Sequence, residues 1–239
     1  MKRGANPGTL YVVSTPIGNS DDVTLRALRV LGDVAVIAAE DPQRTQALCE
    51  RHRIHTPLMS YHNENKEEKT ALLLALLGEG QNVALVSDEG TPVIADPGSY
   101  LISEAVRSNI RVTSLPGPCA ALAAVTVSGL PGDRVLFLGA VPRTPATMHR
   151  LLLTLRHEPG TLVWFTPANR LCKTIQAVRD LLGDRYLAVA GNLTTSEEIC
   201  VRGLAEDVLR QLHRTPINGA VTLAIEGCRK KSQSKQKVK

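Results

Sequence analysis

The 239-residue sequence lacks long apolar runs and has few aromatic residues. Phe, Trp and Tyr make up 3% of the chain, which is too few for a sheet that stacks several RNA bases on its rings. The longest apolar runs, such as residues 71–77, are far shorter than the roughly 20 residues that cross a bilayer. No signal-peptide pattern follows Lys2 and Arg3. We therefore expect neither a membrane span nor a secretory signal.

The cysteines form no CxxC pair. They are widely spaced, at positions 49, 119, 172, 200 and 228. This pattern argues against a disulfide framework and against a structural zinc site. It predicts a protein of the reducing cytoplasm, without a bound metal.

Standard nucleotide and hydrolase motifs are also missing. No GxxxxGK[ST] segment is present, and the only Gly-x-Gly near a predicted strand, at residues 78–80, precedes that strand instead of following it. HExxH and GxSxG are absent as well. These absences argue against P-loop hydrolysis, dinucleotide-dependent dehydrogenation, zinc proteolysis and serine hydrolysis.

The formal charge of +5 comes from 28 Lys and Arg against 23 Asp and Glu. Residues 229–239 hold six of these basic residues and no acid, which leaves 22 basic and 23 acidic residues in the body. The net charge of the body therefore predicts no particular partner. Residues 229–239 are predicted to form a basic, disordered tail.

Short apolar segments alternate with helical patterns along the chain. Strands are predicted at residues 9–14, 34–38, 56–60, 82–87 and 111–115 and, after a Gly/Pro cluster at 129–132, at 134–139, 161–165, 186–191 and 220–226. Such alternation favours parallel βαβ units with helices on both faces of the sheet. We predict an α/β protein of two domains, residues 1–117 and 118–228, the first with an open parallel sheet.

Four predicted strands are followed by loops rich in Gly, Pro and polar residues, at 14–19, 39–45, 87–98 and 116–120. A single loop of this kind is an ordinary strand-to-helix turn. Ligands of open parallel sheets bind at the carboxyl ends of the strands. Four such loops at one edge therefore favour a ligand-binding cleft.

Two of these strand ends carry candidate chemistry. Glu40 and Asp41 are adjacent carboxylates, and Arg44, one helical turn on, could hold a carboxylate ionised or bind a phosphate. Asp41 would equally serve as the N-cap of the following helix. Tyr61 and His62 follow the next strand and could offer a stacking ring and hydrogen-bonding groups, or simply form a polar loop.

The loop sequences resemble those of one known family. The similarity runs from Gly8 to Gly227 and includes the segments LYVVSTPIGN, IAAED, SYHNEN, VALVSDEGTPVIADPG, SLPGPCAALAAVTVSGLP and NGAVTLAIEG. These segments are similar to those of the 16S ribosomal RNA cytidine 2′-O-methyltransferases, a family of the tetrapyrrole methylase superfamily. The block at residues 87–98 is the most distinctive of them.

The resemblance implies a two-domain tetrapyrrole-methylase-like fold whose second domain has a mixed sheet. It implies S-adenosylmethionine in a cleft between the domains, a homodimer, and 16S rRNA of the small ribosomal subunit as substrate. Cofactor contacts would fall on Pro16, Asp88, Gly90, Thr91, Ile94, Cys119, Ala120, Thr166, Leu193 and Ala220. RNA-facing and catalytic roles would fall on Glu40, Asp41 and Arg44, with Tyr61 and His62 as substrate-binding residues.

The implied reaction sets chemical requirements. A ribose 2′-hydroxyl is a poor nucleophile and needs alignment and a nearby proton acceptor. Asp41 or Glu40 is the candidate acceptor, and Arg44 would orient it or hold a phosphate. Carboxylates such as Asp88 would suit the positive sulfonium. The basic tail would add salt-sensitive RNA affinity that does not depend on sequence.

Several positions depart from the family pattern. Pro42-Gln43-Arg44 stands where Thr-Arg-His is usual, Glu89 replaces an Ala and Cys119 replaces a Ser. The second domain differs most, at residues 165–170 and 191–195. The altered second domain keeps open a catalytically idle relative that binds the ribosome. A methyltransferase for porphyrin or corrin rings is the alternative within the same superfamily, although the loops STPIGN and AED argue against it.

Overall fold

The computed structural model describes residues 6–228, and the chain divides between Cys119 and Ala120 into two units. We call them the N-terminal unit and the C-terminal unit and describe each by itself. The basic tail at residues 229–239, predicted to be disordered, lies outside the described residues. Within residues 6–228, no helix combines the length and the apolar character needed to cross a membrane.

The N-terminal unit is built on a five-stranded sheet in which every pairing is parallel. Its strands are β1 (Thr9–Val13), β2 (Val36–Ala39), β3 (Leu58–Ser60), β4 (Val83–Val86) and β5 (Arg111–Leu115), in the order β3-β2-β4-β1-β5. The central strands β2 and β4 are apolar and buried throughout, as expected where helices cover both faces. The parallel pairing brings the carboxyl ends of all five strands to one edge.

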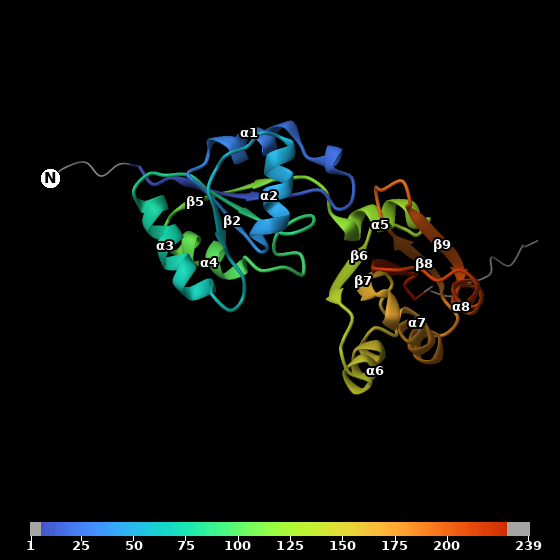
Figure 1. Ribbon diagram of the computed structural model, residues 1–239. Coiled ribbons are helices and arrows are strands. Elements are labelled where there is room, and N and C mark those ends of the chain that lie inside the picture. Colours follow the sequence, from blue (N-terminus) through green and yellow to red (C-terminus); the bar gives the residue numbers. More distant parts are fainter. Residues whose placement is uncertain (1–5, 229–239) are drawn as a thin grey trace, which may run out of the picture. The chain divides into compact units, whose positions relative to one another are not determined.

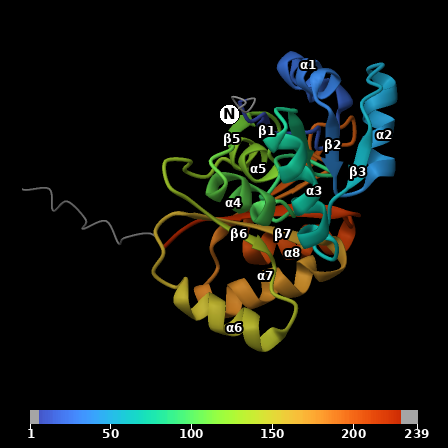
Figure 2. The same cartoon turned by 90° about the vertical axis from the view of Figure 1, so that its left-hand side faces the viewer.

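Helices pack on both faces of this sheet, as Figures 1 and 2 show. They are the 3₁₀ turn η1 (Ser20–Asp22), α1 (Leu25–Asp33), α2 (Pro42–Arg51), α3 (Lys66–Gly78) and α4 (Ser99–Arg107). Leu31 of α1 and Cys49 of α2 pack with Ile37 in one core cluster. Leu73 of α3 and Leu101 of α4 pack with Leu85 in the other. The predicted open parallel sheet with helices on both faces is confirmed.

The C-terminal unit contains a mixed five-stranded sheet. Its strands are β6 (Val135–Ala140), β7 (Thr161–Pro167), β8 (Tyr186–Gly191), β9 (Ile199–Leu204) and β10 (Ala220–Ile225), in the order β6-β7-β10-β8-β9. Only β6 and β7 pair in parallel, and β10 lies antiparallel between β7 and β8. The mixed sheet implied by the resemblance is confirmed.

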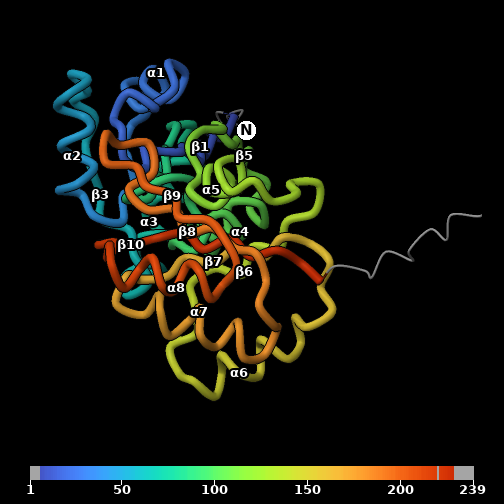
Figure 3. The backbone as a smooth tube through the Cα atoms, turned by 90° about the vertical axis from the view of Figure 1, so that its right-hand side faces the viewer, coloured from blue at the N-terminus to red at the C-terminus, as the bar shows by residue number. Residues whose placement is uncertain are grey.

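Four helices cover this second sheet: α5 (Ala120–Ser128), α6 (Pro145–Thr154), α7 (Ala168–Leu182) and α8 (Ala205–Arg214). Helices α6, α7 and α8 bury Leu152, Ile175 and Val208 in one large cluster with Trp164. Alternate strand residues such as Ala188 are buried outside this cluster, and α5 contacts β8 and β10. Figure 3 shows α5 on one side of the strands and α6 to α8 on the other.

One strand was not predicted from the sequence. Strand β9 lies at the edge of its sheet and is only half-buried. Arg202 and Gly203 interrupt its apolar pattern, and the Arg202 guanidinium instead donates a 2.7 Å hydrogen bond to the Val127 carbonyl. An edge strand with a charged residue has no buried alternation to reveal it.

Candidate functional site

The polar loops of the N-terminal unit meet at the carboxyl edge of its sheet. Backbone hydrogen bonds join Thr15, after β1, to Gly90, after β4, with N–O distances of 2.8 and 3.2 Å. The Thr91 hydroxyl donates to the Pro118 carbonyl at 2.9 Å and lies 2.9 Å from the Ser14 hydroxyl. The loops after β1, β4 and β5 therefore form one hydrogen-bonded assembly.

The loop at residues 87–98 has an unusual backbone. Val93 and Ala95 have φ angles of 76° and 70°, and Gly90 and Gly98 have 86° and 128°. Positive φ is costly for a β-branched residue such as Val93. Strain of this kind persists where the surroundings over-determine the conformation, and it clusters at ligand-binding sites.

An acidic cluster with one arginine lies where the β2 and β4 loops meet. The Asp88 carboxylate accepts a 2.8 Å hydrogen bond from the Asp41 backbone N–H. Arg44 lies 3.4 Å from Glu89, 3.9 Å from Asp88 and 4.0 Å from Asp41. Asp41 is also the N-cap of α2, because its side chain accepts from the Gln43 N–H at 2.9 Å. Asp41 is therefore the N-cap of α2, as one of its two interpretations predicted, and its side chain also lies beside Arg44.

Two other carboxyl groups in this region resist ionisation. Partial burial raises the pKa of Glu40, and the negative charges of Asp96 and Asp88 raise it further. Burial raises the pKa of Asp96 to about 6, although a hydrogen bond with Ser87 opposes the shift. Within residues 6–228 the Glu40 carboxyl group makes no hydrogen bond. Glu40 therefore combines raised basicity with unoccupied acceptor oxygens.

The pKa of Asp96 predicts a pH-dependent effect on stability. Because the pKa in the folded state lies above the unfolded value, Asp96 destabilises the fold at neutral pH and has no such effect below about pH 4. After discounting for its partial exposure, we expect Asp96→Asn to raise the free energy of unfolding by about 1 kcal/mol at pH 7.5. Chemical denaturation of both proteins at pH 7.5 and pH 4 measures this. A gain of the same size at pH 4 would contradict the assigned titration.

Two grooves adjoin the acidic cluster. One, of about 520 Å³, is lined by Glu40, Asp41, Pro42, Ser60, His62, Asn63, Glu64 and Pro97. The other, of about 360 Å³, is lined by residues that include Pro16, Arg44, Ser87 and Asp88. The structure thus brings the predicted residues Glu40, Asp41 and His62 together at one groove.

The Tyr61 side chain does not reach either groove. It is 1% exposed and packs in the core cluster with Leu73 and Leu101. Its hydroxyl lies 3.2 Å from the Thr70 hydroxyl and accepts from the Leu101 N–H at 3.1 Å. The prediction that this ring stacks on substrate is therefore wrong, because the ring is buried. The hydroxyl of the buried side chain satisfies a backbone N–H in the first turn of α4.

The buried position predicts the outcome of Tyr61→Phe. The variant leaves the Leu101 N–H without its partner, so we expect a loss of about 1–2 kcal/mol in the free energy of unfolding. Affinity for the RNA substrate that the resemblance implies, measured at a temperature where the variant is folded, should not change. A gel-shift titration beside a urea denaturation curve separates the two effects, and weakened RNA binding by the folded variant would restore a substrate role.

Three of the four predicted cofactor residues of the C-terminal unit, Thr166, Leu193 and Ala220, lie at one sheet edge, and the fourth, Ala120, begins α5. Strand register sets Ala220 opposite Pro167 and Val221 opposite Thr166, while Val221 also faces Gly191, at the end of β8. Leu193 lies two residues beyond Gly191 and is buried, between two residues of positive φ. The carboxyl ends of β7 and β8 therefore adjoin the beginning of β10.

The residues present fit a bound cofactor in two respects. The Thr166 hydroxyl is buried without a hydrogen-bond partner among residues 6–228. Such a group is costly unless a ligand or water satisfies it. In the N-terminal unit, Asp88 and Glu89 supply the negative charge that suits a sulfonium cation.

Sequence reasoning missed Asp96 and Ser87. Both belong to the distinctive block at residues 87–98, but nothing in the local pattern distinguishes a buried carboxylate from an exposed one. Asp96 is also preceded by two positive-φ residues, Val93 and Ala95, which helix or strand patterns do not predict. The only local indication is the sequence Asp96-Pro97-Gly98 at the end of the loop, which predicts a turn but not a buried carboxylate.

Comparisons with known proteins agree with this geometry. Residues 9–209 match the model of the tetrapyrrole (corrin/porphyrin) methylases. The chain is 39% identical over 220 residues to ribosomal RNA small subunit methyltransferase I of Thermotoga maritima, covering 92% of this chain and 99% of the relative. It is 43% identical over 192 residues to the protein of that name from Escherichia coli, covering 80% and 67%.

Solved structures show the same fold. The structure of cobalt precorrin-4 methyltransferase superposes with a TM-score of 0.67 at 20% identity, covering 91% of this chain and 94% of that one. Uroporphyrin-III C-methyltransferase from Thermus thermophilus gives a TM-score of 0.61 at 26% identity, again covering 91% and 94%.

The chain belongs to the tetrapyrrole methylases and, within them, to the family of ribosomal RNA small subunit methyltransferase I. The predicted family and fold class are thereby confirmed, as is the prediction that the chain is a methyltransferase. Members of the family take the methyl group from S-adenosylmethionine, so the predicted cofactor is confirmed as well.

Proposed function

We propose that this protein methylates the ribose 2′-hydroxyl of a cytidine in 16S rRNA, with S-adenosylmethionine as methyl donor. The observation that carries the proposal is the position of Glu40, a carboxyl group of raised pKa that lines an open groove beside Asp41. Relatives of about 40% identity that bear the ribosomal methyltransferase name support the RNA substrate.

Glu40 is the proposed proton acceptor. A 2′-hydroxyl becomes a competent nucleophile as its proton leaves, and a carboxylate whose pKa lies above the ordinary value is the stronger base. Asp41 suits this role less well, because its carboxylate already accepts the Gln43 N–H and lies 4.0 Å from Arg44. The sequence left both carboxylates open, and the structure favours Glu40.

Asp41 and Arg44 are proposed to position the substrate. Arg44 is more than half exposed and contacts three carboxylates at 3.4–4.0 Å, so it can exchange one of them for an RNA phosphate at small cost. His62 lies on the same groove, where its ring nitrogen is 3.1 Å from the Asn65 side-chain nitrogen. These residues would hold the ribose near Glu40.

The cofactor supplies, when bound, a methyl group made electrophilic by its sulfonium. In the N-terminal unit we propose that Pro16, Gly90, Thr91, Ile94, Cys119 and Asp88 hold it, with Asp88 complementing its charge. In the C-terminal unit the proposed contacts are Ala120, Thr166, Leu193 and Ala220. The hydrogen bonds between Thr15 and Gly90 and between Thr91 and Pro118 would keep the first set rigid.

A transfer assay tests the proposal. Purified protein is mixed with radiolabelled S-adenosylmethionine and either 30S subunits from cells that lack this gene or uroporphyrinogen. We expect label on the ribose of one cytidine in the 30S subunits. Label on the ring alone would establish a tetrapyrrole methylase instead, and an absence of cofactor binding in calorimetry would establish an idle relative.

Assembly and location are part of the same proposal. We propose that the protein acts as a homodimer, as the resemblance implies, and that it does so in the cytoplasm, as the cysteine pattern predicts. Light scattering of the purified protein at micromolar concentration should give twice the 25.7 kDa mass of the chain. A monomeric mass at that concentration would contradict the proposed dimer.

A further inference from the structure

We propose that the surface around helix α6 binds the phosphate backbone of the RNA substrate. This α6 basic surface comprises Arg143, His149, Arg150, Arg156 and His157. The inference rests on the proposed function and adds to it a docking surface in the C-terminal unit. It would hold the RNA without reading its sequence.

The charge of this part of the chain is strongly one-sided. Residues 134–179 hold seven Lys or Arg and a single acid, Glu158. The body as a whole, with 22 basic and 23 acidic residues, is nearly neutral. Glu158 is already paired with Arg134, at 3.0 Å. The local positive charge is therefore not neutralised from within the segment.

Other arginines of the segment are engaged, but those of the α6 basic surface are not. Arg170 donates to the Val141 and Pro142 carbonyls, and Arg179 pairs with Glu206 at 2.5 Å. Within residues 6–228, Arg143, Arg150 and Arg156 are exposed and form no ion pair. Exposed guanidinium groups without partners are suited to bind phosphate oxygens.

Helix α6 presents its basic residues outward. Thr144 caps the helix by accepting the Thr147 N–H at 3.2 Å, and Pro145 occupies the first turn. Met148 and Leu152 are buried in the unit's core, so the neighbouring positions His149 and Arg150 face solvent. The core contacts thus fix the outward direction of the basic side chains.

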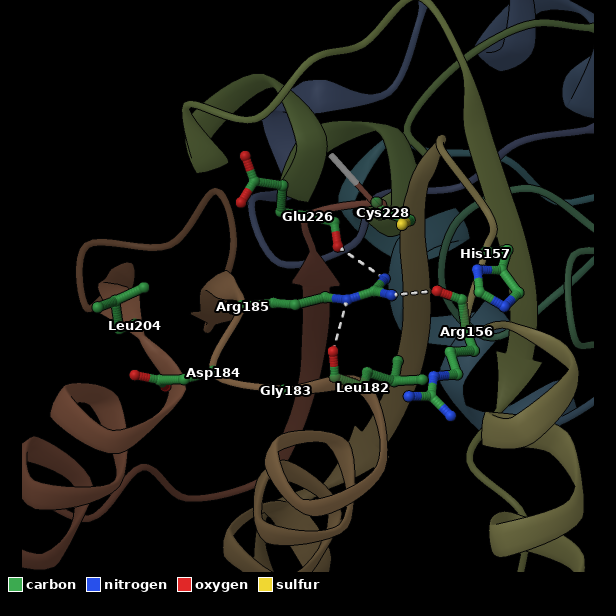
Figure 4. Close-up of a pocket in the computed structure, with 10 residues that line it drawn as sticks. Arg156, His157, Leu182, Gly183, Asp184, Arg185, Leu204, Glu226 and Cys228 are labelled. Carbon is green, nitrogen blue, oxygen red and sulfur yellow. Dashed lines mark hydrogen bonds between the residues drawn. The ribbon is translucent and has the colours of Figure 1, made fainter. Parts of the chain in front are cut away.

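Beyond the end of α6, a pocket of about 390 Å³ continues the surface (Figure 4). Arg156 and His157 line it together with Arg185 and Cys228. The Arg185 guanidinium donates to the carbonyls of Arg156, Glu226 and Leu182 at 2.7, 3.2 and 3.3 Å. Arg185 therefore fixes the backbone of Arg156 and leaves the Arg156 side chain available to a ligand.

The basic tail is attached at this pocket. Gly227 passes so close to the chain that a Cβ there would lie 2.1 Å from the Pro159 carbonyl oxygen. Cys228 then donates its N–H to the Glu158 carbonyl at 2.6 Å. The next residues in sequence are 229–239, with their six Lys and Arg. The tail's attachment point and the α6 basic surface therefore adjoin, and one RNA backbone could contact both.

A salt titration of RNA binding tests the proposal. Affinity for 16S rRNA is measured from 50 to 200 mM salt for the wild type, Arg150→Gln/Arg156→Gln and a chain ending at residue 228. The matched control is Arg26→Gln/Arg29→Gln, two exposed arginines of α1 that form no ion pair among residues 6–228. Log affinity decreases as log salt rises. We expect the double variant to make this slope shallower by about 1.5, because it loses two phosphate contacts. The control slope should not change.

The outcomes separate the two proposals. If the double variant keeps the wild-type slope while the wild type methylates 30S subunits, the proposed RNA binding by the α6 basic surface is wrong and the proposed function stands. If the slope falls although no rRNA is methylated, the surface stands and the proposed function fails. Binding to anionic phospholipid vesicles without binding to RNA would overturn the surface as an RNA site. Unchanged melting temperatures of the variants confirm that each slope reports on folded protein.

Discussion

Replacing Glu40 with glutamine is expected to lower kcat for rRNA methylation by about 100- to 10,000-fold, the usual contribution of a positioned general base. Gln has nearly the same shape but cannot accept the 2′-hydroxyl proton. Affinity for S-adenosylmethionine should change little, because Glu40 is proposed to face the ribose. Single-turnover assays with 30S subunits measure the rate, and calorimetry measures cofactor binding.

Glu50→Gln is the matched control. Glu50 lies on the exposed side of α2 and accepts a hydrogen bond from Gln46 at 2.9 Å, outside the groove that Glu40 lines. The Glu50→Gln variant should methylate rRNA at the same rate as the wild type. Normal methylation by Glu40→Gln would show that another group accepts the proton.

The pH profile adds a second readout. Asp96 is the largest electrostatic contribution to the raised pKa of Glu40, after burial. Removing that charge with Asp96→Asn should therefore move the rising limb of kcat to lower pH. An unchanged limb in Asp96→Asn would mean that a group other than Glu40 controls the rate.

Gly98→Ala is expected to have the largest effect on the site's structure. Gly98 has a φ of 128°, which disfavours any residue with a side chain. A Cβ there would lie 2.8 Å from Cδ2 of Leu85, a buried core residue. We expect a loss of about 3 kcal/mol in the stability of the N-terminal unit and cofactor affinity at least tenfold weaker.

Gly129→Ala separates backbone strain from steric overlap. Gly129 also has a positive φ, of 75°, but a Cβ there meets nothing within 4 Å. This variant should lose only about 1 kcal/mol and bind the cofactor normally. Thermal melts and calorimetry compare the two variants. Equal losses in both would show that the contact with Leu85 is unimportant.

Strand prediction from sequence worked best where strands are buried on both faces. Strands β2 and β4 are short apolar runs closed by polar turns, and their carboxyl ends had to share an edge once the sheet was parallel. That reasoning placed Glu40, Asp41 and the loop at residues 87–98 together. The same reasoning failed for β9, because the apolar pattern that reveals a strand arises from burial. Strand β9 is a half-buried edge strand and contains the charged residue Arg202.

The limits at the site have a similar cause. Residue type indicated that Tyr61 could stack on a base, but only packing reveals that its ring is buried against Leu73. Likewise, the loop sequence names Asp96 without showing the burial that raises its pKa to about 6. Contacts between residues distant in sequence decide such properties, and local patterns carry little information about them.

The central position of β10 has a consequence for biosynthesis. Because β10 pairs with both β7 and β8, the second sheet consists of two separate pairs, β6-β7 and β8-β9, until residues 220–225 have left the ribosome. In the N-terminal unit the strand that joins β1 to the β2-β3 pair is β4 (Val83–Val86), and all strands of that unit precede Cys119. During translation the first sheet can therefore close early, while the second must wait for its last strand to insert.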